Sequence, residues 1–152
     1  MSGRIEPVLV LMCDDIRHEL DGGHSLMGVA TPILEVSGFP VRRRLWFAVV
    51  MNTLAVGVTK FETRIRWKGE VKWSAEHEIL IDLEERGTVF PISGPFAGYD
   101  EPGDLTFEFV ADGKTTEVQK WSVIGPSELN KSEPALPPAR PVTATKMKKP
   151  KK

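Results

Sequence analysis

The stretch VLVLMCDDIRHELDGGHSLMGVA, residues 8–30, decides the fold. Its first part, residues 8–13, is an apolar run with the length of a buried strand, and two aspartates end it. A second apolar run, residues 25–30, follows the turn residues Asp-Gly-Gly at 21–23. Two apolar runs on either side of a glycine-containing turn predict a β-hairpin with an extended polar connection.

Further along, the chain alternates between short apolar runs and turn residues. Residues 45–51, LWFAVVM, form a continuous apolar run of strand length, and residues 59–68 alternate between apolar and charged side chains. That alternation is typical of a strand with one buried and one solvated face. Asp112-Gly113 predicts a tight hairpin, and the change of parity between Val118 and Trp121 predicts a β-bulge. Further strands are predicted at 33–36, 71–73, 78–83, 88–92, 105–110 and 115–124.

No stretch has a convincing helical pattern, so the sequence predicts an all-β fold. About eight short strands separated by turns indicate an antiparallel β-sandwich, immunoglobulin-like or C2-like, and a closed barrel is the alternative. We expect a turn at 52–58 and a long Gly/Pro-rich loop at 93–103. An aromatic-bearing loop of that length is typical of a binding site.

Composition divides the chain into two parts. The 152 residues carry a net charge of −1, and residues 127–152 have seven Lys or Arg against two Glu. That segment therefore carries +5, which leaves −6 for residues 1–126. We predict a sandwich domain over 1–126 and a disordered Pro/Lys-rich tail over 127–152, because the tail has too few apolar side chains to form a core.

The single cysteine excludes an intramolecular disulfide. The N-terminus lacks the pattern of a signal peptide, and no apolar run has the length of a membrane helix. We therefore expect a cytoplasmic protein.

Several side chains have metal-ligand chemistry, and we predict neither a metal site nor a cofactor. The calcium alternative uses loop carboxylates, and its candidates are Asp14, Asp15, Asp100 and Asp104. Adjacent aspartates on a strand point to opposite faces, so pairing with turn backbone or with nearby arginines is the favoured reading. A zinc alternative uses Cys13, His18 and His24, whose spacing matches no standard zinc motif.

The aromatic residues indicate a contact surface instead. Trp46 and Phe47 are neighbours, so one of them faces away from the core if the other faces into it. Phe96 and Tyr99 lie in the predicted long loop. We expect these four residues to bind a partner. The tail lysines are expected to contact anionic partners by charge alone; they are Lys146, Lys148, Lys149, Lys151 and Lys152.

Two segments resemble an uncharacterised bacterial family. CDDIRHE (13–19) followed by GGHSLMGV (22–29) is similar to the Cys-Asp-Asp-x-Arg-x-Glu and Gly-x-x-Ser-Leu-x-Gly-Val hairpin of that family. PGDLTFEFVADG (102–113) resembles its closing strand and Asp-Gly hairpin. The resemblance implies a small β-sandwich and brings no catalytic residues with it.

These observations predict a non-enzymatic interaction or assembly module that binds a protein partner or associates with itself. A calcium-type module or metal-dependent enzyme is one alternative. Association with nucleic acid through the tail is the other.

Overall fold

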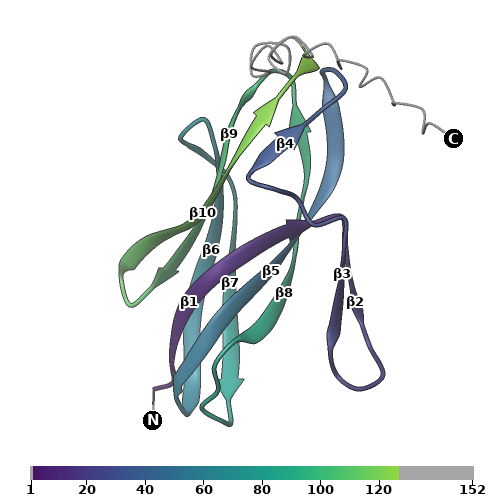
Figure 1. Ribbon diagram of the computed structural model, residues 1–152. Helices are drawn as coiled ribbons and strands as arrows, with labels where there is room; N and C mark the ends of the chain where they lie inside the picture. The colour runs from purple at the N-terminus through teal and green to yellow at the C-terminus, as the bar shows by residue number, and fades with distance from the viewer. Residues whose placement is uncertain (1, 127–152) are drawn as a thin grey trace, which may run out of the picture.

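The computed structural model describes residues 2–126, and their regular structure consists of β-strands (Figure 1). The predicted tail, with the five lysines expected to contact anionic partners, lies outside these residues. The strands are β1 (Arg4–Cys13), β2 (Asp15–His18), β3 (His24–Met27), β4 (Ile33–Glu35), β5 (Val41–Ala55), β6 (Gly57–Trp67), β7 (Glu70–Ile81), β8 (Thr88–Tyr99), β9 (Gly103–Ala111) and β10 (Lys114–Ile124). No helix within 2–126 has the length and apolar character needed to cross a membrane.

The strands form two main sheets and a separate hairpin. One sheet has the order β4-β10-β9-β6-β7, the other has the order β1-β5-β8, and β2 pairs only with β3. The two main sheets pack in a sandwich-like arrangement, which confirms the predicted all-β fold. Phe47 of the three-stranded sheet lies across the core from Phe107 and Trp121, with ring centroids 5.0 Å and 6.0 Å away.

The alternation of buried and exposed side chains along β6 explains how this strand contributes to the core. Phe61, Thr63 and Ile65 are buried, and Glu62 and Arg64 lie on the opposite face, as the sequence predicts. The Asp112-Gly113 hairpin and the bulge in β10 are also confirmed, the bulge lying between residues 117 and 119.

The predicted loop at 93–103 is wrong, because β8 continues to Tyr99. Its register with β5 shifts so that Gly94 and Pro95 together lie opposite Leu45, which is a bulge. A Cβ on Gly94 would lie 2.7 Å from the Phe47 ring, so this glycine permits close packing inside a strand. Proline is tolerated here because β8 is an edge strand.

Two further strand boundaries differ from the prediction. β5 runs through the predicted turn at 52–58 as far as Ala55, and residues 71–73 and 78–83 belong to one strand, β7. The polar residues between them alternate in exposure, with Ser74 exposed and His77 half-buried. An edge strand with one solvated face needs no turn to explain such polarity.

The stretch at residues 8–30 forms a hairpin in a different way from the one we predict. Its first run, β1, pairs with β5, and the hairpin consists of β2 and β3 only. The next strand, β4, pairs in parallel with β10, so the fold is not purely antiparallel. The short strand β2 lies in the stretch predicted as a polar connection, whereas β4 lies within the strand predicted at 33–36.

Candidate functional site

The outward face of the three-stranded sheet is apolar. Three rows of directly paired residues cross β1, β5 and β8 on this face. They are Leu9–Val50–Val89, Leu11–Ala48–Pro91 and Cys13–Trp46–Ser93. A solvated sheet face normally carries polar side chains, so an apolar face of this kind needs a cover.

The β2–β3 hairpin covers part of that face and forms a third layer. Ile16 and the half-buried Leu26 pack against Cys13 and Ala48, both fully buried, with Leu11, Trp46 and Val89 at the border. The hairpin begins where Asp14 donates its backbone N–H to the Met27 carbonyl at 2.9 Å.

Beyond the hairpin, the same face carries an arginine–aromatic patch formed by Arg44, Trp46 and Phe96. The Arg44 guanidinium lies 5.5 Å from the centroid of the Trp46 ring, which is a cation–π contact. Phe96 is paired directly with Arg44 and is 70% exposed. A large apolar side chain at that exposure, beside an arginine, is typical of an interaction surface.

Arg44 differs from its two neighbours in its partners. The Arg42 guanidinium pairs with Asp100 at 3.0 Å, and Arg43 pairs with Asp14. Within residues 2–126 Arg44 has no carboxylate partner, and its strongest polar contact is a weak hydrogen bond of 3.4 Å to the Ser93 hydroxyl. The run of three arginines is visible in the sequence, and the unpaired one is recognised only from the fold.

The structure divides the four aromatic residues expected at the surface. Trp46 and Phe96 lie in the patch, whereas Phe47 and Tyr99 are buried in the core at 0% and 2% exposure. The Tyr99 ring packs against Trp67, with centroids 4.6 Å apart and planes inclined at 45°, and burial raises the pKa of its hydroxyl to about 12. Phe47 and Tyr99 therefore cannot be contact residues in this fold.

The four candidate calcium ligands are not brought together. Each aspartate has its own basic partner: Asp14 pairs with Arg43, Asp15 with Arg17, Asp100 with Arg42, and Asp104 with Lys120. Across the described residues no group of three or more His, Cys, Asp or Glu side chains is placed to hold a metal ion. Calcium needs six to eight oxygens around one point, which these separate ion pairs do not supply.

The three candidate zinc ligands are also separated in space. Cys13 is fully buried in the sheet, where its thiol lies 3.7 Å from the Trp46 carbonyl. Burial, followed by the charges of Asp14 and Asp15, raises the pKa of that thiol. His18 and His24 lie together at the outer end of the hairpin.

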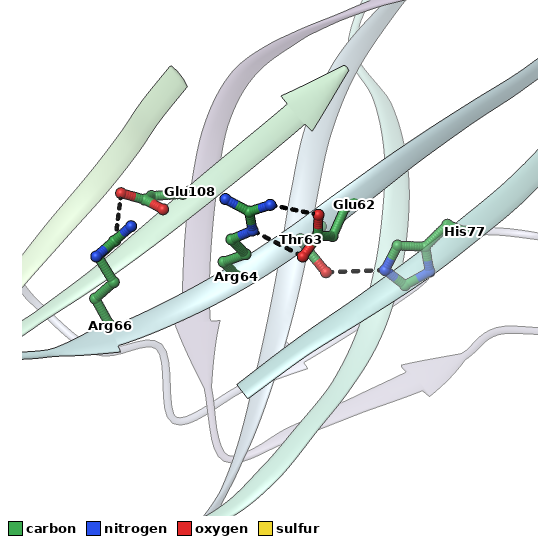
Figure 2. A network of polar contacts seen from close by, with 6 residues as sticks. All are labelled: Glu62, Thr63, Arg64, Arg66, His77 and Glu108. Carbon is green, nitrogen blue, oxygen red and sulfur yellow. Dashed lines mark hydrogen bonds and ion pairs between the residues drawn. The ribbon is translucent and has the colours of Figure 1, made fainter. Parts of the chain in front are cut away.

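The outward face of the five-stranded sheet is polar and largely self-neutralised (Figure 2). Glu62 accepts two hydrogen bonds of 2.7 Å from Arg64, and Glu108 accepts one of 2.7 Å from Arg66. The hydrogen bond from Arg64 lowers the pKa of Glu62. The charges on this face pair with one another and are largely shielded from water, since Glu108 is only 9% exposed. The arginine–aromatic patch, where Arg44 has no carboxylate partner within residues 2–126, is therefore the better candidate for a contact.

Comparison with known proteins adds no functional information. No family model matches the chain, and no curated protein is similar to it in sequence. The resemblance of the hairpin motif to a bacterial family stays a prediction.

Proposed function

We propose that this protein is a non-enzymatic interaction module that binds a protein partner through the arginine–aromatic patch. The observation that carries the proposal is the exposed Phe96 ring beside Arg44, a guanidinium without a carboxylate partner in residues 2–126. A partner that fits this patch offers a carboxylate to Arg44 and an apolar or aromatic group to Phe96.

The position of the patch supports a role in binding. Trp46 is held between the hairpin cluster and the Arg44 guanidinium, and Phe96 follows the bulge in β8. The paired strands already hold the backbone of these residues, so binding does not have to order a loop. Arginine and tryptophan at the centre of an interface contribute a large share of binding energy.

The test is selection of peptides from a randomised display library on the full-length protein, with the Phe96→Ala variant as the counter-target. We expect selected peptides to combine Asp or Glu with an aromatic or aliphatic residue. Arg44→Gln and Phe96→Ala should each weaken binding about tenfold, the effect of losing a central contact. Binding should also weaken as salt rises, because the arginine contact is electrostatic.

Matched control variants distinguish binding at the patch from non-specific binding. Arg42→Gln removes an arginine on the same strand that is already paired with Asp100, and Leu80→Ala removes a 73% exposed side chain on β7. Both should leave peptide affinity unchanged. Peptides that bind equally well to Phe96→Ala, or a selection that yields none, would refute the proposal.

A further inference from the structure

A pair of histidines lies at the end of the β2–β3 hairpin. His18 and His24 are directly paired residues of β2 and β3, with ring centroids 4.6 Å apart and planes inclined at 61°. His18 is exposed and His24 half-buried, so both rings can be reached from solvent. Their side chains lie on one face of the hairpin because directly paired residues share a face.

The ring nitrogens of this pair are free to act as ligands. In the part of the chain that the structure describes, neither imidazole forms a hydrogen bond or an ion pair. The third histidine is different, because His77 Nε2 lies 2.8 Å from the Thr63 hydroxyl. A neutral imidazole with an unshared nitrogen is the commonest protein ligand for transition metals.

Hydrogen bonds in the hairpin turn fix the backbone beside the two histidines. The Glu19 N–H donates to the Gly23 carbonyl at 2.9 Å, and the Gly22 N–H donates to the Glu19 carbonyl at 3.1 Å. Asp21 accepts a hydrogen bond of 2.9 Å from the Gly23 N–H through its side chain. These bonds close the turn next to the histidine pair, so the backbone positions that carry the two rings are set before any ligand binds.

The separation suits one metal ion. Two nitrogens bound at 2.0–2.1 Å to a tetrahedral ion lie about 3.3 Å from each other. Rings with centroids 4.6 Å apart reach that separation by rotation of their side-chain torsions. No third His, Cys, Asp or Glu in residues 2–126 completes the set, so water would occupy the remaining positions.

We propose that His18 and His24 chelate a divalent transition-metal ion of borderline character, Zn²⁺, Ni²⁺ or Cu²⁺. Imidazole suits these ions, whereas Ca²⁺ and Mg²⁺ prefer oxygen ligands. Binding joins β2 to β3 across the outer end of the hairpin and so stabilises the layer that covers Cys13 and Ala48. This site is independent of the arginine–aromatic patch.

Titration calorimetry of the full-length protein, free of any polyhistidine tag, tests the proposal with ZnCl₂ as the probe. We expect saturable binding of one Zn²⁺ per chain. His18→Gln and His24→Gln should each abolish it at the same metal concentrations, and His77→Gln should retain it. CaCl₂ should give no binding. Zinc binding that persists in the His18→Gln/His24→Gln double variant, or no saturable binding up to millimolar zinc, would overturn the proposal.

A second measurement needs no variant. The imidazole C–H proton resonances of the three histidines are followed by NMR during the same zinc titration. We expect two resonances to shift or broaden together and the third, from His77, to stay in place. Movement of all three, or of none, would show that zinc does not bind at the hairpin pair.

Discussion

Asp14 shows how one side chain determines the backbone around it. Its carboxylate pairs with Arg43 and occupies the space where a Cβ of Gly28 would lie. Gly28 has a φ of 61°, a conformation that favours glycine. Local packing and the ion pair with Arg43 therefore account for Asp14 and Gly28 of the hairpin motif.

Gly28→Ala should lower the free energy of unfolding more than a glycine substitution at an open turn. The Asp14 Cγ atom would lie 2.8 Å from the new Cβ, so the ion pair with Arg43 must shift. Gly113→Ala is the matched control, with a φ of 72° and nothing near its Cβ. We expect about 1 kcal/mol for Gly113→Ala and at least about 1 kcal/mol more for Gly28→Ala in urea denaturation. Equal losses would contradict this account of Asp14.

His77 makes stability depend on pH. Burial lowers the pKa of its imidazole from the ordinary 6.5, since its ring stacks on Phe61 with centroids 4.8 Å apart. The unfolded chain therefore takes up a proton at a higher pH than the folded protein does. The resulting stability is complete above pH 6.5 and is lost as pH falls toward the folded-state pKa.

We therefore expect the free energy of unfolding to decrease as pH falls below about 6.5. His77→Gln should flatten this slope, because it removes the histidine whose pKa burial lowers. The low pKa values of Glu62 and Asp104 act at lower pH. An unchanged slope in His77→Gln would assign the pH dependence to other groups.

At the scale of strands, the edges of the sheets explain where sequence-based prediction succeeds and where it fails. Strands with clear alternation, such as β6 and β9, are predicted correctly, because each has one face in the core. The second part of β8, residues 93–99, is mistaken for a loop because Gly94, Pro95 and Gly98 are turn residues elsewhere. Only its position at the edge of a sheet makes them compatible with a strand.

The free edge of β7 is protected by charge. In the described chain β7 pairs only with β6, and its exposed side includes Glu76 and Glu78. Unpaired strand edges promote association unless charged side chains interrupt them. We expect Glu76→Val to raise the mass measured by light scattering at high protein concentration. Glu84→Val removes the same charge from a loop and should leave the protein's mass unchanged. Equal behaviour of the two variants would argue against charge protection of the edge.

The hairpin layer should open independently of the sandwich. It forms its own two-stranded sheet, and its burial depends on Ile16 and Leu26 over Cys13. We expect Cys13 to react slowly with a thiol reagent in the native protein. Ile16→Ala should accelerate the reaction with little change in the melting temperature of the sandwich. Rapid labelling of the unaltered protein would contradict the burial of the thiol.

At the scale of the molecule, one core joins the two main sheets. Nineteen buried side chains from both sheets and their connections form a single cluster. We expect circular dichroism and tryptophan fluorescence to report the same urea midpoint. Phe107→Ala, at a fully buried position, should lower the free energy of unfolding by about 3–5 kcal/mol and shift both signals together. Separate midpoints would show that the sheets unfold independently.

The sequence predicts the class of fold and two residues of the candidate site, Trp46 and Phe96, but not how the site is assembled, for a physical reason. Alternation shows that Trp46 and Phe47 face opposite ways without showing which one faces out. Register places Arg44 beside Phe96, and no local pattern encodes pairing between strands about fifty residues apart. The arginine–aromatic patch is therefore a property of the assembled sheet.

The parallel pairing of β4 with β10 has a consequence for synthesis of the chain. Ile33 lies beside Ser122, so β4 leaves the ribosome about ninety residues before its partner does. At about 5–20 residues per second this delay is about 5–20 s. Until Ser122 and its neighbours have been made, a nascent chain therefore carries the short strand β4 without its partner, and chaperones have that interval in which to bind it.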